Sequence, residues 1–286
     1  MMTENEFSKK SYEYAVGAIK ATSHPPLPDE AIRRLSEAGM SDFPRILDEF
    51  GWARGIEGSV RERIRGEYEY AVKFIREVSP DTSLTDLLLF EEDACNLKLF
   101  LKGQLIGTDV TDMASAHGSI PIEILRGSVE AGDFSLISEV LDRELKGIEN
   151  EKDPFVISSR ADRAMFMHTL ALAKKKNRAL YEMLLTYGAA KNRISEARLR
   201  LMGLEREKLS DLLLPVEYKS TEGETRDVAE IIADEKTAIA KAMYDLRSGE
   251  NFAPIAEYFF AKKSEAETLR RLLTQCEIKD KEALER

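Results

Sequence analysis

The sequence is poor in the residues that build sheets, disulfide frameworks and membrane spans. Its 286 residues include only 10 Val, 16 Gly, 9 Pro and 2 Cys. Scarce Val disfavours a sheet, because β-branched side chains suit pleated strands. Cys95 and Cys276 lie far apart without a CxxC pair, so we expect reduced thiols. There is no run of 18 uncharged apolar residues and no apolar signal core in the first residues, so neither a membrane span nor secretion is expected.

Motifs that hold metals, cofactors or nucleic acids are also missing. His24, His117 and His168 lie in different segments, and none has a second His or Cys at ligand spacing, so we expect no metal. There is no GxxxxGK[ST] phosphate loop, and the glycines of residues 51–59 do not follow a strand-like run, as a dinucleotide site requires. The formal net charge of −10 argues against nucleic acid as the main partner, because phosphate binding needs a basic face. We expect neither cofactor nor nucleic acid.

Helix-forming residues dominate what is present. Leu, Ala and Glu number 32, 29 and 35, which predicts an all-α fold. Lys262 lies within the apolar pattern of residues 255–273, where its aliphatic stem can lie at the edge of the buried face. Three stripes of apolar residues at helical spacing each predict one helix: Phe90, Ala94, Leu97, Leu101 and Leu105; Phe134, Ile137, Leu141, Leu145 and Ile148; and Ile255, Tyr258 or Phe259, Ala266, Leu269 and Leu273.

Glycine- and proline-containing stretches divide the chain. Residues 23–31 predict a turn before a helix, and residues 51–59, with three glycines, predict a loop or helix junction. Ser83 and Asp86 resemble a capping box. Two looser stretches, 107–121 and 213–227, separate three expected helical units, 1–107, 108–212 and 213–286, and the second stretch could hold a short strand.

Two charged clusters can be interpreted either as functional sites or as solvated helix surfaces without a functional role. Glu91, Glu92 and Asp93 could serve a two-carboxylate hydrolase, but three acids in a Glu-rich chain equally suit a solvated helix face. The basic residues 174–178 suit a hydrated helix end, where cations complement the helix dipole. They could also contact acidic groups of a partner or lipid headgroups. For both clusters we favour the interpretation as a solvated helix surface.

Two six-residue segments echo each other on separate amphipathic helices. Residues 93–98 read Asp-Ala-Cys-Asn-Leu-Lys and residues 265–270 read Glu-Ala-Glu-Thr-Leu-Arg. The acid and the polar residue three positions later share a helix face, whereas the cation points away from both. The acid could therefore cap or bridge a neighbouring helix. The cation is expected to face solvent or another chain.

These segments resemble the C subunit of the archaeal and bacterial V/A-type ATPases, which is equivalent to the d subunit of the vacuolar enzyme. The acid-x-x-Asn-Leu-Lys helix carries part of the resemblance. In the middle stretch, residues 187–202, the family's Asp and Asn fall approximately on Gly188 and Lys191, while Arg193 and Arg198 keep positive charge. The closing helix and three shorter stretches carry the rest: Pro254, Tyr258, Ala261-Lys262, Glu265 and Leu269-Arg270, with Tyr14-Ala15-Val16, residues 43–53 and Asp162-Arg163.

The resemblance implies an all-helical funnel of three similar units around a pseudo-threefold axis, with no catalytic, cofactor or metal site. It implies a peripheral protein on the cytoplasmic face of a membrane. There the protein would link the central shaft subunits D and F to the membrane proteolipid ring during ion transport, of protons or sodium. The residues that it singles out, as structural or partner-facing, are Asp93, Asn96, Lys98, Tyr258, Glu265 and Arg270.

Two other functions remain open from the sequence. A generic helical adaptor or scaffold suits the composition, but the chain shows no fixed period of the length that stacked repeats have. A helical hydrolase would use Glu91, Glu92 and Asp93.

Overall fold

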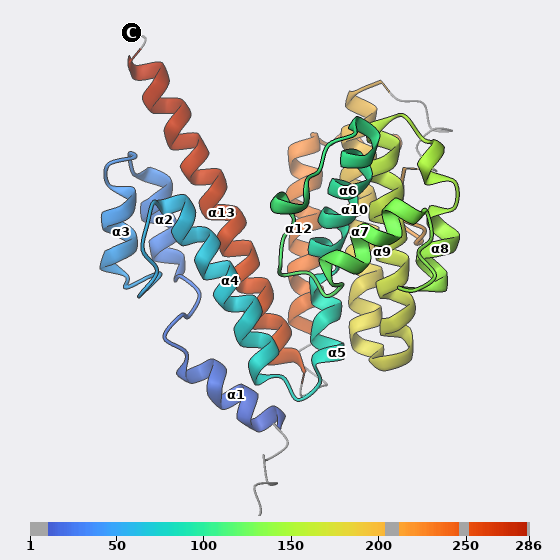
Figure 1. The fold of residues 1–286 in the computed structure, drawn as a ribbon. Coiled ribbons are helices and arrows are strands. Elements are labelled where there is room, and N and C mark those ends of the chain that lie inside the picture. The colour runs from blue at the N-terminus through green and yellow to red at the C-terminus, as the bar shows by residue number, and fades with distance from the viewer. Residues whose placement is uncertain (1–10, 204–211, 246–251, 285–286) are drawn as a thin grey trace, which may run out of the picture. The chain divides into compact units, whose positions relative to one another are not determined.

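The computed structural model describes residues 11–203, 212–245 and 252–284, and these residues form helices, turns and loops without a strand. The predicted all-α fold is confirmed. Figure 1 shows the helices in chain order. Their bounds are α1 Tyr12–Ala21, α2 Asp29–Glu37, α3 Phe43–Glu49, α4 Val60–Val78, α5 Thr82–Thr85, α6 Phe90–Ile106, α7 Ile122–Ala131, α8 Glu139–Leu145, α9 Pro154–Lys176, α10 Arg178–Leu201, α12 Val228–Asp245 and α13 Ala253–Leu284, with 3-10 turns at Asp86–Leu89, Thr111–Met113 and Ile148–Asn150.

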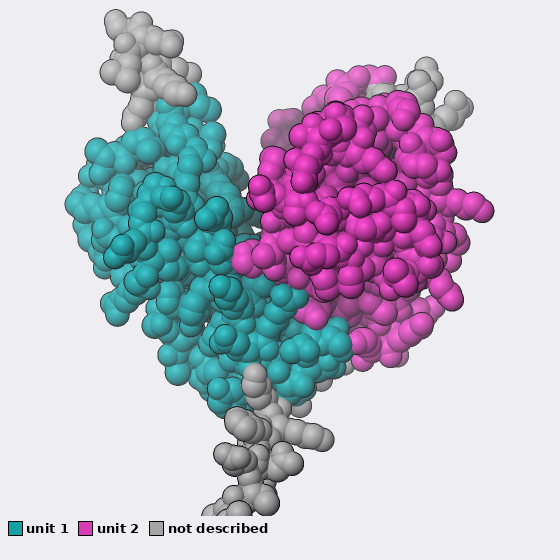
Figure 2. All heavy atoms as spheres, viewed as in Figure 1, with its two compact units in different colours: residues 1–85, 251–286 teal, residues 86–250 magenta. Residues whose placement is uncertain are grey.

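The chain divides into two compact units, coloured separately in Figure 2. Unit 1 contains residues 1–85 and 251–286, so both ends of the chain contribute to it, and unit 2 contains residues 86–250. The loop of residues 107–121, where the sequence suggested a join between domains, lies inside unit 2. The three-unit division at 107 and 212 stays a prediction.

Unit 1 is built on the long helix α13, which packs against α4, α1 and α2. The predicted stripe from Ile255 to Leu273 is confirmed, because its apolar residues, Phe259 and Leu269 among them, are buried along α13. On α4, Ile64 and Ile75 are fully buried as well. Each such side chain contributes about 1.5–3 kcal/mol when it is removed from water. Apolar burial therefore holds α4 and α13 in one core.

Unit 2 is a bundle in which α9 packs against α6, α8 and α10, while α12 packs against α10. The stripe predicted from Phe90 to Leu105 is confirmed as the inward face of α6 from Phe90 to Leu101, whereas Leu105 is half-buried. Helix α10 approaches α9 closely at Gly188, where an added Cβ would stand 2.7 Å from the ring of Phe166. A side chain at this position would require the Phe166 ring to shift.

Three local predictions were wrong. Residues 134–148 do not form one helix: α8 starts only at Glu139, because the Ser138 hydroxyl accepts hydrogen bonds from the N–H groups of Val140 and Leu141 and caps it there. Residues 213–227 form no strand in the described chain. The capping residue before the Leu-rich run is Asp81, whose carboxylate accepts from the Leu84 N–H, and not Ser83.

Candidate functional site: buried polar residues that hold loops

On helix α6 of unit 2, Asp93 and Asn96 share a buried face, with 1% and 2% of their surfaces exposed. The Asn96 side chain donates to the Ser115 carbonyl and accepts from the Ser115 N–H, both at 2.8 Å. The Asp93 carboxylate accepts from the Ser119 hydroxyl at 2.6 Å and from the Ile120 N–H at 3.0 Å. Together the two side chains fix the loop between α6 and α7 on the surface of α6.

Helix α10 holds its own following loop in the same way. The Asn192 amide, 1% exposed, donates to the Leu214 carbonyl and accepts from the Leu214 N–H, both at 2.8 Å. One turn later, the Glu196 carboxylate accepts from the Thr221 N–H and hydroxyl and from the Ser220 hydroxyl. Burial alone would raise the pKa of Glu196, but these hydrogen bonds outweigh it and lower that pKa below its ordinary value. Glu196 therefore stays ionised at neutral pH.

The sequence put Gly188 and Lys191 at the approximate positions of the family's acid and amide, and the structure places neither of them on the loop after α10. Gly188 packs against α9, and the Lys191 ammonium lies 3.5 Å from a carboxylate oxygen of Glu91. The residues that hold the loop are Asn192 and Glu196. In the sequence, Asn192 beside Arg193 was a signal for a loop-holding residue. The common residues around this pair did not show which position of the helix corresponds to the family's Asn.

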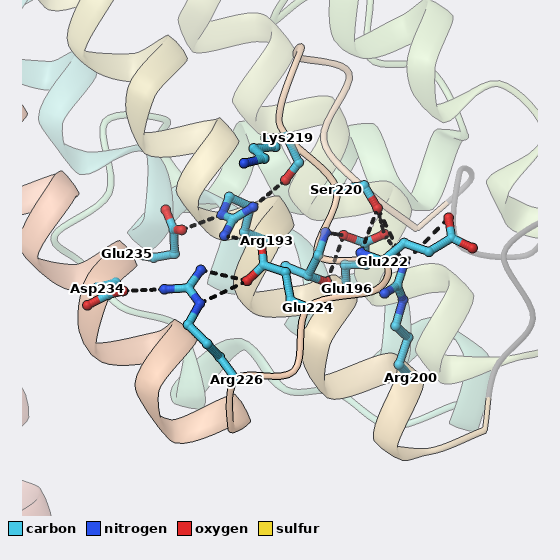
Figure 3. Close-up of polar contacts among 11 residues, drawn as sticks. Arg193, Glu196, Arg200, Lys219, Ser220, Glu222, Glu224, Arg226, Asp234 and Glu235 are labelled. Atoms are coloured by element: carbon cyan, nitrogen blue, oxygen red, sulfur yellow. Dashed lines mark hydrogen bonds and ion pairs between the residues drawn. The ribbon is translucent and has the colours of Figure 1, made fainter.

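Beside Asn192, a network of charges extends from α10 to α12 (Figure 3). The guanidinium of Arg193, 9% exposed, contacts the carboxylates of Glu224 and Glu235 and the carbonyl of Lys219. Arg226 in turn contacts Glu224 and Asp234. At the other end, Arg200 donates to Glu196 at 2.8 Å. The network joins α10, the loop before α12 and α12 itself.

In unit 1, α13 holds the segment between α1 and α2. The Tyr258 hydroxyl donates to the His24 carbonyl at 3.0 Å. The Glu265 carboxylate accepts from the Leu27 N–H and, at 2.8 Å, from the indole N–H of Trp52. Two of the residues singled out by the sequence, Tyr258 and Glu265, therefore anchor N-terminal loops to the C-terminal helix.

Glu265 belongs to a buried cluster of charges inside unit 1. The Lys262 ammonium lies 2.6 Å from a carboxylate oxygen of Glu265 and 2.7 Å from one of Glu67, and none of the Lys262 side chain is exposed. The imidazole of His24 lies 2.8 Å from the other Glu67 oxygen. The sequence predicted that only the aliphatic stem of Lys262 lies at the edge of the core. The structure buries its charge as well, because two carboxylates are in place to receive it.

The two cations of the echoed segments are in different environments. The Lys98 ammonium on α6 lies 2.7 Å from a carboxylate oxygen of Asp162 on α9, and both side chains are partly exposed. Arg270 is exposed on α13 and forms no ion pair with another described residue. The structure does not bring Lys98 or Arg270 to the acid of its own segment.

The acidic cluster of residues 91–93 does not converge on one point. Asp93 is buried and holds the α6–α7 loop, whereas Glu91 contacts the Tyr187 hydroxyl and Lys191. Among the described residues, His, Cys, Asp and Glu side chains form no group of three that could hold a metal ion. His168 is partly buried, and this burial lowers its pKa.

A groove of about 530 Å³ opens in unit 2 between α6, α9 and α10. Aromatic side chains, Phe90, Phe166 and Tyr187, line it together with Lys98 and Arg198. Aromatic residues and Arg are enriched in surfaces that bind other proteins.

No described helix is long and apolar enough to cross a membrane. Comparison with curated proteins finds no match. Residues 15–280 match the family model described as ATP synthase (C/AC39) subunit. The match reaches into both units and includes Asp93, Asn96, Lys98, Tyr258, Glu265 and Arg270. The chain therefore belongs to the C/AC39 subunit family of the V/A-type ATP synthases.

Proposed function

We propose that this protein is the non-catalytic coupling subunit in the central stalk of a rotary V/A-type ATPase. In this role it sits peripherally on the cytoplasmic face of the membrane, binds the proteolipid ring at one end and receives the shaft subunits D and F at the other. Ion transport is then linked mechanically to ATP hydrolysis or synthesis. The observation that carries the proposal is the family match over residues 15–280.

The internal structure supports a mechanical role, because torque is transmitted only through a body that resists deformation. Helices pack as densely as organic crystals, but loops between them are usually compliant. Here the loops are held by buried side chains: Asn96 and Asn192 each bind both polar groups of one loop residue. Such fully satisfied buried networks stiffen the chain that they contact.

The same arrangement supports three similar units around a pseudo-threefold axis. Helices α6, α10 and α13 each carry buried polar residues that bind the backbone of a neighbouring loop, through Asn96, Asn192 and Glu265 respectively. The recurrence of one device on three helices is what repeated units of common origin would have. We assign Lys98 and Arg270, the partly exposed and the exposed cation, to partner contacts.

The proposal is tested by isolating the two associations separately. Purified protein is mixed with detergent-solubilised proteolipid ring and, in parallel, with the D–F shaft complex at low ionic strength. We expect stable complexes with each. The variant Arg270→Gln should weaken one of them, whereas the matched control Arg65→Gln, an exposed arginine of α4, should weaken neither. Failure of both wild-type associations would reject the coupling role and leave the adaptor function standing.

A further inference from the structure

The glycine-containing loop between α3 and α4 in unit 1 surrounds a hollow of about 500 Å³. Its wall is formed by Asp48, residues 51–58 and Arg63. We propose that this hollow binds a phosphate group, carried either by a lipid headgroup or by a free phosphate compound.

The backbone of the loop has the alternating handedness of an anion-binding nest. Gly51, Ala53 and Gly55 have φ values of +63°, +57° and +77°, and Ala53 is the one non-glycine residue in the described chain with a positive φ. Trp52 and Arg54, which lie between them, do not have positive φ values. Successive residues of opposite handedness turn their N–H groups toward one side, where they form a concave surface that attracts anions.

Three successive N–H groups of this nest have no partner in the described structure. The first two loop N–H groups are used to end α3: Gly51 donates to the Asp48 carbonyl and Trp52 to the Leu47 carbonyl. The N–H groups of Ala53, Arg54 and Gly55 donate to no described atom. A strained non-glycine conformation at Ala53, combined with unused donors on either side, is the pattern of a backbone shaped for binding.

Two guanidinium groups border the same hollow. Arg54 lies over Gly51, where its nearest guanidinium nitrogen stands 2.8 Å from the position of a Cβ, and it forms no ion pair with a described carboxylate. Arg63 donates to Asp48 at 2.7 Å and to the Trp52 carbonyl at 2.9 Å. Its Nε is buried and has no hydrogen-bond partner among the described residues. A buried donor of this kind is available to a further acceptor.

The hollow also contains two carboxylates, Asp48 and Glu57. Asp48 is occupied by Arg63, and Glu57 is exposed. The formal charges of the four ionisable side chains therefore cancel, and attraction for an anion comes from the N–H groups and the unpaired Arg54. Guanidinium groups and backbone N–H groups together recognise phosphate oxygens, which accept several hydrogen bonds at once.

The loop is held rigidly from behind, so the donors are fixed before a ligand arrives. The Trp52 indole donates to Glu265, and the guanidinium of Arg63 and the ammonium of Lys262 lie 6.0 and 5.7 Å from the centre of its ring. Trp52 and Ala53 are each 5% exposed. A site that needs no ordering on binding loses less entropy than a flexible loop would.

The chain contains a single tryptophan, Trp52, and it reports on this loop directly. Its fluorescence is recorded while the full chain is titrated with inorganic pyrophosphate. In a second titration the probes are vesicles of phosphatidylcholine with one-fifth phosphatidylglycerol, and vesicles of pure phosphatidylcholine. A saturable change with pyrophosphate assigns the site to free phosphate compounds. A change only with the phosphatidylglycerol vesicles assigns it to lipid headgroups, and either result supports the proposal.

Arg54→Gln is the decisive variant, because Arg54 is exposed and its replacement leaves the core intact. We expect binding to weaken about ten-fold, the loss of one charge-assisted hydrogen bond. Arg65→Gln on α4 removes the same charge from an exposed residue outside the hollow and should leave binding unchanged. The proposal is overturned if neither probe changes the fluorescence or if vesicles of pure phosphatidylcholine produce the same change. It is also overturned if Arg54→Gln and Arg65→Gln bind the probe with the same affinity.

Discussion

Single residues in this protein carry charge into places where it is costly unless it is paired. Lys262 is the strongest case, since its ammonium is buried between Glu67 and Glu265. Burying an unpaired charge costs several kcal/mol, so each member of the cluster depends on the others. Glu265 also receives the N–H groups of Leu27 and Trp52, and thus the cluster fixes both N-terminal loops.

We expect Lys262→Met to lower the free energy of unfolding by about 3–5 kcal/mol, because two buried carboxylates lose their counter-charge. Chemical denaturation followed by circular dichroism measures the change. The control is Lys20→Met, which removes an exposed lysine from α1 in the same unit and should shift the free energy of unfolding by less than about 0.5 kcal/mol. Equal effects of the two substitutions would contradict the pairing described for Lys262.

A second prediction concerns Tyr258, whose pKa is raised well above its ordinary value mainly because the phenol is buried. The folded state therefore retains a proton that the unfolded state loses as the pH rises above about 10. The stabilisation by this group is fully present below that pH and is lost as the pH rises further.

In Tyr258→Phe, we expect a loss of about 1 kcal/mol at neutral pH, because the hydrogen bond to the His24 carbonyl is missing. The additional fall in stability above about pH 10 should become smaller than in the wild type. Thermal unfolding between pH 7 and pH 11 tests both parts. An unchanged alkaline slope would show that Tyr258 does not titrate as its burial implies.

The apolar faces of helices could be predicted from the sequence, whereas a helix start set by a local hydrogen bond could not. The stripes on α6 and α13 were predictable, because one continuous apolar face is enough to define a buried helix. The helix expected over residues 134–148 was not, because a local Ser138 cap outweighed a favourable apolar spacing. Hydrogen bonds between a side chain and nearby backbone groups leave a weak signal in a single sequence.

The sequence predicted several of the buried polar residues, but it did not predict which groups they bind. Asp93, Asn96, Tyr258 and Glu265 were singled out in advance by resemblance, and the structure places all four on buried helix faces. Their partners lie up to 238 residues away, as Leu27 does from Glu265, and no local pattern contains that information. Asn192 and Glu196 were missed for a related reason. Only the folded structure shows which residues of α10 bind the loop that follows this helix.

A third prediction belongs to the scale of the element. Asn192→Ala should lower the free energy of unfolding by about 1–3 kcal/mol, because the N–H and the carbonyl of Leu214 lose their buried partner. Amide hydrogen exchange should also become faster in the loop that begins at Leu214. Asn150→Ala is the control, because the Asn150 amide bonds only an exposed neighbour, Glu149. Unchanged exchange in the loop of Asn192→Ala would contradict its holding role.

At the scale of the whole molecule, the described residues form two all-helical units whose ionisable side chains in the interior are engaged in holding loops and helices together. Family membership places the chain in a V/A-type ATP synthase, and the proposed role within that assembly is to carry force between two partners. A coupling part of this kind has a characteristic failure: without it, each partner still performs its own chemistry, but the two are no longer linked.

The most direct test uses membrane vesicles that contain the ATPase, stripped of this subunit and then reconstituted with it. ATP-driven ion accumulation and ATP hydrolysis are measured on the same vesicles. We predict that stripped vesicles lose ion accumulation while the catalytic head still hydrolyses ATP, and that adding the purified protein restores accumulation. Ion accumulation that continues at the original rate in vesicles shown to lack the subunit would contradict the coupling role.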